Sequence, residues 1–378
     1  MNRRDVRCGF LSASVLALVT LGHAHARDAT LQSACFPPET LKAVPGEGLV
    51  ARGDRQFDSA STPKDMLPAS PVLQALRGSI RRVELPKGQR LIALTLDFCE
   101  QRGEVAGYVG GIIDVLRQEK IPATLFLGGK WMRSHQTRTE QLMTDPLFEI
   151  ANHSDLHRNM RKLEGATLAD EVSAPQRVYE GYRARLATTQ CAAKAPDGVQ
   201  SVAPRLGLFR FPFGACNATS LAAVNDAGLL AIQWDVSTGD PDPHQTADMI
   251  VNTLVRRVRA GSIIIAHGNG RGWHTADALP RAIPKLKAMG YTFVTVSELL
   301  ARGTPVIAES CYDSKPGDTN RYDFLGSLHA KTKPEDAGWI TWLPTMSLEP
   351  DPAAKPPRRA AAKSREPVHD DAPITKPY

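Results

Sequence analysis

The sequence predicts an α/β protein built on a deformed parallel (β/α) barrel of seven strands, with N- and C-terminal extensions. Short apolar runs alternate with segments of helical spacing between residues 91 and 296, which is typical of right-handed βαβ units. Seven such runs suit a barrel better than a short open sheet. Polar residues follow several of the runs, as they do at the mouth of a parallel barrel.

Each strand is predicted from a short apolar run, and each helix from apolar residues at helical spacing. The run 91–96 has no polar alternation, which indicates a strand buried on both faces. Val109, Ile112 and Leu116 fall on one helical face, and Pro122 ends that segment. The predicted strands are 91–96, 123–127, 147–151, 207–211, 229–234, 262–266 and 291–296. The predicted helices are 105–118, 140–143, 168–186, 219–227, 247–259 and 278–289.

The N-terminus has the pattern of a secretory signal peptide over residues 1–26. Arginines 3, 4 and 7 form a positive region, an apolar run follows, and Ala24-His25-Ala26 is typical of a cleavage site. The run is too short to anchor the chain in a bilayer. We therefore expect export to the periplasm or the extracellular space, with no transmembrane anchor after cleavage. The alternative is a buried N-terminal helix.

The remaining chain divides into four predicted segments by composition. They are an N-terminal extension over 27–88, the barrel over 89–303, a C-terminal extension over 304–350 with Trp339 and Trp342, and a disordered Pro/Ala-rich basic tail over 351–378. The net charge of +6 lies largely at the two ends, and no basic stripe interleaved with aromatics is present. The sequence therefore predicts no nucleic-acid partner. The basic tail is interpreted as a solvated end, or as a contact for an anionic wall polymer.

The cysteines are consistent with an exported protein. Cleavage of the signal would remove Cys8 and leave five, at positions 35, 99, 191, 216 and 311. Five cysteines allow up to two disulfides and leave one thiol. Their spacing does not define the connectivity.

Five polar residues follow apolar runs and would meet at one mouth of a parallel barrel. They are Asp97, His153, Arg210, Asp240 and His267. His153 also lies four residues before His157, and the two imidazoles would share one face if the segment is helical. Such a pair can hold a divalent metal.

These residues lie in motifs that resemble, in order, the five motifs of the polysaccharide deacetylases, carbohydrate esterase family four. The resemblance covers residues 91–300. The matching segments are Thr95-Leu96-Asp97, His153-Ser154-Asp155-Leu156-His157, Arg210-Phe211-Pro212-Phe213-Gly214, Trp234-Asp235-Val236-Ser237-Thr238-Gly239-Asp240 and Ile265-Ala266-His267. Five ordered matches, each near a predicted strand end, make the resemblance specific.

The resemblance implies a hydrolytic metal site. His153 and His157 would bind the metal, with zinc expected first and cobalt or nickel as alternatives. Asp97 would be the general base, kept ionised by Arg210.

The remaining roles concern the oxyanion and the leaving group. The resemblance implies that the backbone N–H of Phe213 binds the oxyanion. His267 would protonate the leaving nitrogen, and Asp240 would orient it. Taken singly, each residue has a structural interpretation: Asp97 could cap a turn, Arg210 could pair an ion, and His267 could be a core histidine.

The sequence departs from the family where a second aspartate usually ligates the metal. That position is Phe98, which cannot bind a hard metal. Glu100 is the first candidate for the third ligand and Asp97 the second. Cys99 would be a softer ligand and could instead form a disulfide with Cys216.

A second departure lies in the cleft wall. Pro241 stands where the family often has tryptophan. Trp273 is a candidate for stacking on a sugar face, with a packing role as the alternative.

The sequence therefore predicts an exported, metal-dependent hydrolase that removes acetyl groups from N-acetylated sugars of a glycan. The glycan would be of the peptidoglycan, chitooligosaccharide or poly-N-acetylglucosamine type. Two alternatives remain open. One is a catalytically impaired glycan-binding protein on the same fold, and the other is a hydrolase of O-acetyl esters or other amides.

Overall fold

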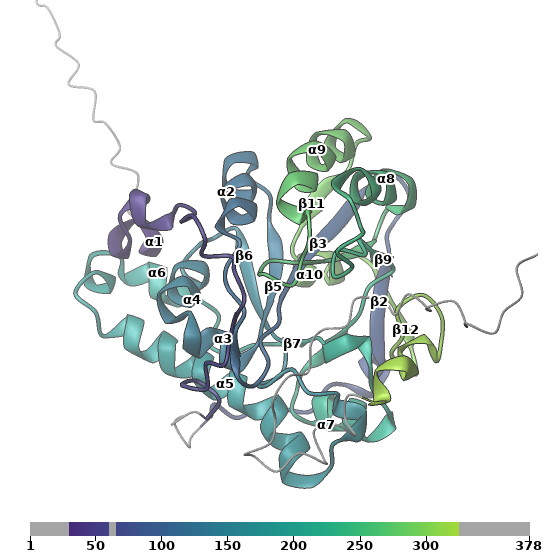
Figure 1. Ribbon diagram of the computed structural model, residues 1–378, viewed down its shortest axis with the longest axis horizontal. Helices are drawn as coiled ribbons and strands as arrows, with labels where there is room; N and C mark the ends of the chain where they lie inside the picture. Colours follow the sequence, from purple (N-terminus) through teal and green to yellow (C-terminus); the bar gives the residue numbers. More distant parts are fainter. Residues whose placement is uncertain (1–29, 60–65, 325–378) are drawn as a thin grey trace, which may run out of the picture. The chain divides into compact units, whose positions relative to one another are not determined.

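The computed structural model describes residues 30–59 and 66–324, which form a curled, mainly parallel sheet flanked by helices (Figure 1). Among these residues the main sheet has ten strands, in the order β12-β2-β8-β7-β6-β5-β3-β10-β9, with β11 pairing with β3. All of its pairs are parallel except that of β12 with β2. The strands are β2 (Ser79–Glu84), β3 (Leu91–Phe98), β5 (Ala123–Leu127), β6 (Phe148–Asn152), β7 (Leu208–Phe209), β8 (Leu230–Ile232), β9 (Val236–Ser237), β10 (Ile263–His267), β11 (Thr292–Val294) and β12 (Thr304–Ala308).

All seven predicted strands are present, and the deformed parallel barrel is confirmed as the fold. Three further strands, β2, β9 and β12, extend the sheet beyond the predicted seven. β2 escaped prediction because two arginines interrupt its apolar residues in the segment Ser-Ile-Arg-Arg-Val-Glu. A small second sheet pairs β1 (Ala51–Arg52) with β4 (Glu104–Val105).

The sheet curls until β2 meets the start of β10. Arg82 forms an isolated bridge with Ser262, and the Val83 N–H donates to the Gly261 carbonyl over 2.9 Å. Gly261 has a φ of +83°, and a Cβ there would lie 1.7 Å from the Val83 carbonyl oxygen. Only glycine allows this approach, so this residue helps to close the barrel.

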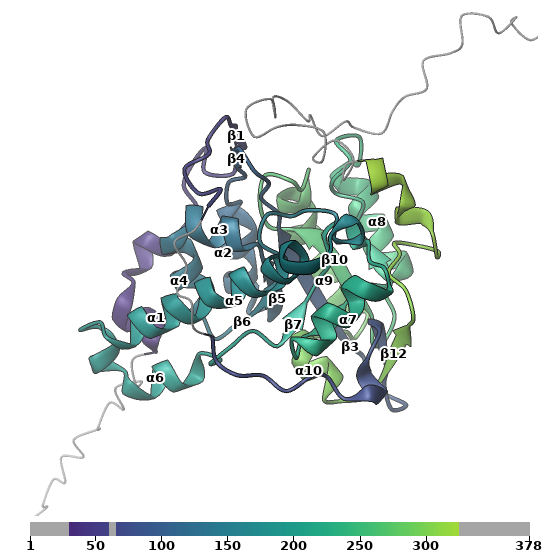
Figure 2. The ribbon, with the colours of Figure 1, turned by 90° about the horizontal axis from the view of Figure 1, so that it is seen from below.

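The helices cover the sheet (Figure 2). The long helix α5 packs beside α3 and α4, and α8 packs against α9. The helices are α1 (Leu31–Cys35), α2 (Gly110–Glu119), α3 (Gly129–Ser134), α4 (Gln136–Met143), α5 (Gly165–Ala187), α6 (Pro196–Ser201), α7 (Ala218–Asp226), α8 (Ala247–Arg257), α9 (Thr275–Ala288) and α10 (Val296–Leu300). Short 3-10 helices lie at Pro38–Leu41, Gln74–Leu76, Met160–Lys162, Ala192–Lys194, Pro212–Gly214 and Asp318–Tyr322.

The six predicted helices correspond to α2, α4, α5, α7, α8 and α9. The first begins at Gly110 rather than 105, because Glu104–Val105 is the strand β4 that pairs with β1. The helices α1, α3, α6 and α10 were not predicted, since five or six residues are too few for a helical period to stand out.

Two disulfides tie peripheral segments to the core. Cys35 in α1 pairs with Cys191, and Cys216 after β7 pairs with Cys311 after β12. Cys99 is a buried free thiol. The suggested pairing of Cys99 with Cys216 is therefore wrong: Cys99 lies just beyond β3 beside His153, whereas Cys216 packs with Cys311 in another cluster.

Within the described ranges, no helix combines the length and apolar character that crossing a membrane requires. The predicted signal peptide, Cys8, the tryptophans at 339 and 342 and the basic tail lie outside the described residues.

Candidate active site

The carboxyl ends of the central strands bring the predicted polar residues together. Asp97 near the end of β3 is the register partner of His267 at the end of β10. Both are buried, at 2% and 7% exposure. His153 follows β6, which lies two strands from β3, and Arg210 follows β7, the next strand of the same sheet. The convergence arises because parallel strands end at one edge.

His153 and His157 lie in a loop after β6 rather than on a helix. Ser154 and His157 have positive φ values of +64° and +52°, which turns the loop back on itself. The Ser154 N–H donates to the Asn152 Oδ1 over 2.9 Å and holds the turn. The two imidazole centroids are 5.0 Å apart. Such strained backbone in non-glycine residues is characteristic of functional sites.

The His153 ring is oriented by its hydrogen bonds. Its Nδ1 lies 3.0 Å from the Arg210 carbonyl oxygen, so in the neutral ring Nδ1 donates and Nε2 keeps its lone pair. That Nε2 lies 3.2 Å from the Cys99 Sγ and 3.7 Å from the Asp97 Oδ2. The buried Nδ1 of His157 has no hydrogen-bond partner among the described residues. This donor geometry fits a metal ligand pair.

Cys99 completes a cluster of potential ligands with these histidines. One donor atom from each of Cys99, His153 and His157 lies within 4.8 Å of the others, and all three residues are buried. Burial alone would raise the pKa of the Cys99 thiol, but the imidazoles of His157, His153 and His267 lower it well below its usual value. Burial alone would lower the pKa of His153, and the charges of Asp97 and Cys99 raise it instead.

Glu100, the first candidate for the third ligand, does not join this cluster. Its carboxylate accepts hydrogen bonds from the Lys130 Nζ (3.0 Å), the Ser134 Oγ (2.8 Å) and the Ala106 N–H (2.9 Å). Glu100 and Lys130 are both fully buried. Because both oxygens already have partners, the geometry places Cys99, and not Glu100, beside the histidines.

Arg210 holds Asp97, the other candidate. Its Nη1 donates to the Asp97 Oδ1 over 2.8 Å and to the Thr95 Oγ1 over 2.6 Å. The guanidinium is fully buried and lies over the Phe126 ring at 4.0 Å. A buried, paired carboxylate with a fixed orientation suits a general base.

Asp240 holds His267 at two points. Its Oδ1 accepts from the His267 Nδ1 over 3.0 Å, and its Oδ2 accepts from the His267 backbone N–H over 2.8 Å. The hydroxyls of Thr238 and Thr275 donate to the same carboxylate. Burial alone would lower the pKa of His267, but Asp240 and Cys99 raise it well above its usual value. This direction favours the protonated imidazole, which is the form that a general acid requires.

Phe213 lies against the histidine loop. It has a φ of +60° within the 3-10 turn Pro212–Gly214. Its ring is 4.7 Å from the His157 ring, and the Tyr322 ring is 5.2 Å from it on another side. The role of its backbone N–H in binding an oxyanion stays a prediction.

Trp273 lies beside the acid pair. Its backbone N–H donates to the Asp240 carbonyl over 2.7 Å, and its side chain is 50% exposed. By contrast Trp131 and Trp234 are buried. Whether the indole stacks on a sugar face or has a packing role stays a prediction.

Sequence reasoning missed the groups that fix the Cys99 segment. The Asn269 Nδ2 donates to the Cys99 carbonyl over 2.7 Å, and the Gly128 N–H donates to the Phe98 carbonyl over 3.2 Å. Nothing in a single sequence marks Asn269 as a partner of residues 170 positions away. The position of Cys99 could have been predicted from its spacing. Residues two apart on a strand share a face, and Cys99 follows Asp97 at that spacing, so both side chains are expected on the same side.

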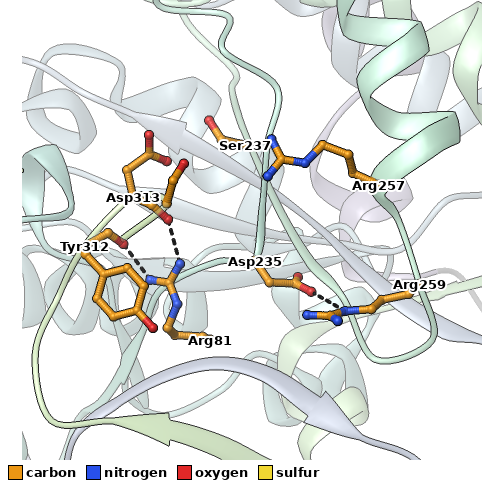
Figure 3. A pocket seen from close by; sticks show the side chains of 8 residues that line it. Arg81, Asp235, Ser237, Arg257, Arg259, Tyr312 and Asp313 are labelled. Carbon is orange, nitrogen blue, oxygen red and sulfur yellow. Dashed lines mark hydrogen bonds and ion pairs between the residues drawn. The ribbon is translucent and has the colours of Figure 1, made fainter. Parts of the chain in front are cut away.

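A cleft of about 220 Å³ is lined by a different set of residues, among them Arg81, Asp235 and Tyr312 (Figure 3). Arg81 donates there to the carbonyl oxygens of Tyr312 and Asp313, and Arg259 donates to Asp235. None of its lining residues is a predicted site residue.

The chain is similar in sequence to known polysaccharide deacetylases. Residues 84–232 match the family model for polysaccharide deacetylase, which spans Asp97, the histidine loop and Arg210 and ends before Asp240. A peptidoglycan-N-acetylglucosamine deacetylase of Bacillus cereus is 29% identical over 223 residues, covering 57% of this chain and 91% of the relative. A chitooligosaccharide deacetylase of Bradyrhizobium sp. is 26% identical over 204 residues, covering 50% and 82%. A crystal structure of the Bc1960 peptidoglycan N-acetylglucosamine deacetylase is 23% identical, with 58% and 92% covered and a TM-score of 0.48.

Proposed function

Because this chain belongs to the polysaccharide deacetylase family, we propose that it is an exported, metal-dependent hydrolase that removes acetyl groups from N-acetylated sugars of a glycan. The relatives' names make peptidoglycan and chitooligosaccharides the first substrates to test. Export is inferred from the signal-like pattern of residues 1–26.

One observation carries the proposal. In the buried pairs Asp97–Arg210 and His267–Asp240, the proposed base and acid are register partners on the neighbouring strands β3 and β10, and Asp97 lies beside His153. Amide hydrolysis needs a base for water and an acid for the leaving nitrogen, and these pairs supply one of each.

Each pair orients its reacting group. Arg210 fixes the Asp97 carboxylate, which takes a proton from water. Asp240 accepts from the His267 Nδ1, so a protonated His267 keeps its Nε2–H for the leaving nitrogen. The backbone N–H of Phe213 is proposed to bind the oxyanion.

The histidine loop suits a divalent metal, with zinc first and cobalt or nickel as alternatives. The His153 Nε2 is presented with its lone pair, and the His157 Nδ1 is buried without a partner among the described residues. When bound, such a metal acts as a Lewis acid that polarises the acetyl carbonyl and lowers the pKa of water.

The test is acetate release from peptidoglycan fragments, chitooligosaccharides and poly-N-acetylglucosamine. We expect release from at least one of them, with a loss of at least about 100-fold in Asp97→Asn and His153→Ala. The exposed residues Asp226 and His244 provide the matched controls Asp226→Asn and His244→Ala. Full activity in Asp97→Asn and His153→Ala would contradict the assigned roles.

A catalytically impaired glycan-binding protein is the second candidate, favoured by Phe98 at the position of the family's usual ligand. Glycan binding without acetate release or bound metal would support it. Acetate release confined to acetylated xylan would instead identify an O-acetyl esterase, and activity on small amides alone would identify another amidohydrolase.

A further inference from the structure

Building on the proposed function, we propose that the Cys99 thiolate is the third protein ligand of the metal. The site is then Cys99-His153-His157, and it binds zinc or another transition metal that accepts sulfur ligands. The set of donors is one sulfur and two imidazole nitrogens, all buried and within 4.8 Å of one another. A tetrahedral zinc separates such donors by roughly 3.3–3.6 Å, and the Cys99 Sγ already lies 3.2 Å from the His153 Nε2.

Phe98 cannot be the third metal ligand, because its side chain is an aromatic ring that packs in the core. Its ring is fully buried, 4.6 Å from the Trp131 ring and 6.4 Å from the Tyr108 ring. A Cβ at Gly268 would lie 2.2 Å from the Phe98 Cζ, so the ring is also tightly confined on that side. Phe98 therefore fills the core, and the next residue faces the histidines.

Glu100 is held elsewhere by buried partners. Turning its carboxylate to the histidines would remove its contacts with Lys130 and Ser134 and leave the fully buried Lys130 ammonium without its carboxylate. An unpaired buried charge is strongly unfavourable. Glu100 thus stabilises the segment that carries Cys99.

The backbone on either side of the thiol is also fixed. The carbonyl of Cys99 accepts from Asn269, and the carbonyl of Phe98 accepts from Gly128. The thiol therefore faces the histidines without requiring a change of the loop. Preorganised ligands of this kind are typical of metal sites.

The alternative use of this thiol is nucleophilic catalysis. A Cys–His–Asp relay needs the thiol and the carboxylate on different imidazole nitrogens. His153 does not meet this condition, because Cys99 and Asp97 both face its Nε2 while its Nδ1 donates to the Arg210 carbonyl. His267 carries Asp240 on its Nδ1 and also interacts with Cys99, so a relay would run through His267, and an S-acetylated Cys99 peptide would reveal it.

The donor set predicts the class of metal. Thiolate and imidazole favour zinc, cobalt and copper, whereas magnesium, calcium and manganese prefer oxygen ligands. A carboxylate in place of the thiolate would shift the preference toward harder ions. The inference therefore makes a prediction about selectivity that does not depend on turnover.

Cobalt(II) substitution of the full chain tests the inference. We expect the wild type to bind one cobalt or zinc ion and the cobalt form to show a thiolate-to-metal charge-transfer band in the near ultraviolet. Cys99→Ser should lose the band and bind zinc at least about 10-fold more weakly. His244→Ala is the matched control and should keep both.

Cys99→Asp is a second variant, which keeps the test decisive if Cys99→Ser does not fold. It should bind metal through an oxygen donor, without the band. A band-free wild-type cobalt protein, unchanged zinc affinity in Cys99→Ser, or an S-acetylated Cys99 peptide found during turnover would each overturn the inference. If the band is present but no glycan releases acetate, the proposed function fails and the ligand assignment stands.

Discussion

Asp97 and His267 occupy paired positions on the adjacent parallel strands β3 and β10. The backbone register therefore sets the separation of the proposed base and acid, and their side chains only refine it. Each is held by a buried partner of opposite charge, Arg210 for Asp97 and Asp240 for His267. Catalytic groups placed on strands in this way are more rigid than groups on loops.

Loss of the Arg210 guanidinium is expected to reduce both stability and activity. Arg210→Met leaves the Asp97 carboxylate buried without its partner, which should lower the free energy of unfolding by about 3–5 kcal/mol. Urea denaturation measures it. Arg77→Met, which removes an exposed ion pair with Asp226, should cost about 0–1 kcal/mol. Equal losses in the two variants would contradict the account.

The acid pair predicts a pH dependence. Burial alone would lower the pKa of His267, but Asp240 and Cys99 raise it well above its usual value, so the proton needed by the leaving group is lost only on the basic side. Asp240→Asn removes the charge and should move the basic limb of kcat/KM to lower pH. An unmoved basic limb would argue against His267 as the acid.

The same pair contributes to stability with a defined sign. The folded pKa of His267 lies above the unfolded value of about 6.5. The stabilisation is therefore complete below about pH 6.5 and is lost as pH rises through the folded pKa. Thermal unfolding of wild type and Asp240→Asn, measured from about pH 6.5 upward, checks this. The difference between their melting temperatures should shrink toward high pH.

Glu100 and the metal ligands are expected to separate in experiment. Glu100→Gln weakens the buried pair with Lys130 and should lower the free energy of unfolding, while the purified protein keeps its metal stoichiometry. Elemental analysis beside urea denaturation gives both readouts. If Glu100→Gln lost its metal without losing stability, Glu100 would be a metal ligand.

The sequence could predict the strands that form the mouth, because their apolar runs are long enough to recognise and their polar ends carry the motifs. It could not predict how the chain turns after them. The spacing of His153 and His157 places them on one face only if the segment is helical, whereas Ser154 and His157 take positive φ values in a loop. Glu100 is acidic and close to Asp97 in sequence, but its carboxylate pairs with Lys130, thirty residues later. Such competition for a buried group is set by tertiary packing.

Trp273 offers a test of substrate contact. Its exposed indole beside the acid pair should stack on a sugar ring, so Trp273→Ala is expected to raise KM for an oligosaccharide several-fold with little change in kcat. Trp273→Phe should retain most of the affinity. Met289→Ala, which removes an exposed side chain beyond the end of α9, is the control. An unchanged KM in Trp273→Ala would assign the indole to another role.

The histidine loop is proposed to hold a metal on which acetyl hydrolysis depends. The most direct measurement is acetate release from chitooligosaccharides and peptidoglycan fragments by the purified protein, before chelation, after chelation and after zinc is restored. The account predicts that release is lost on chelation and returns with zinc, but does not return in His153→Ala. Undiminished release from fully metal-free protein would contradict it.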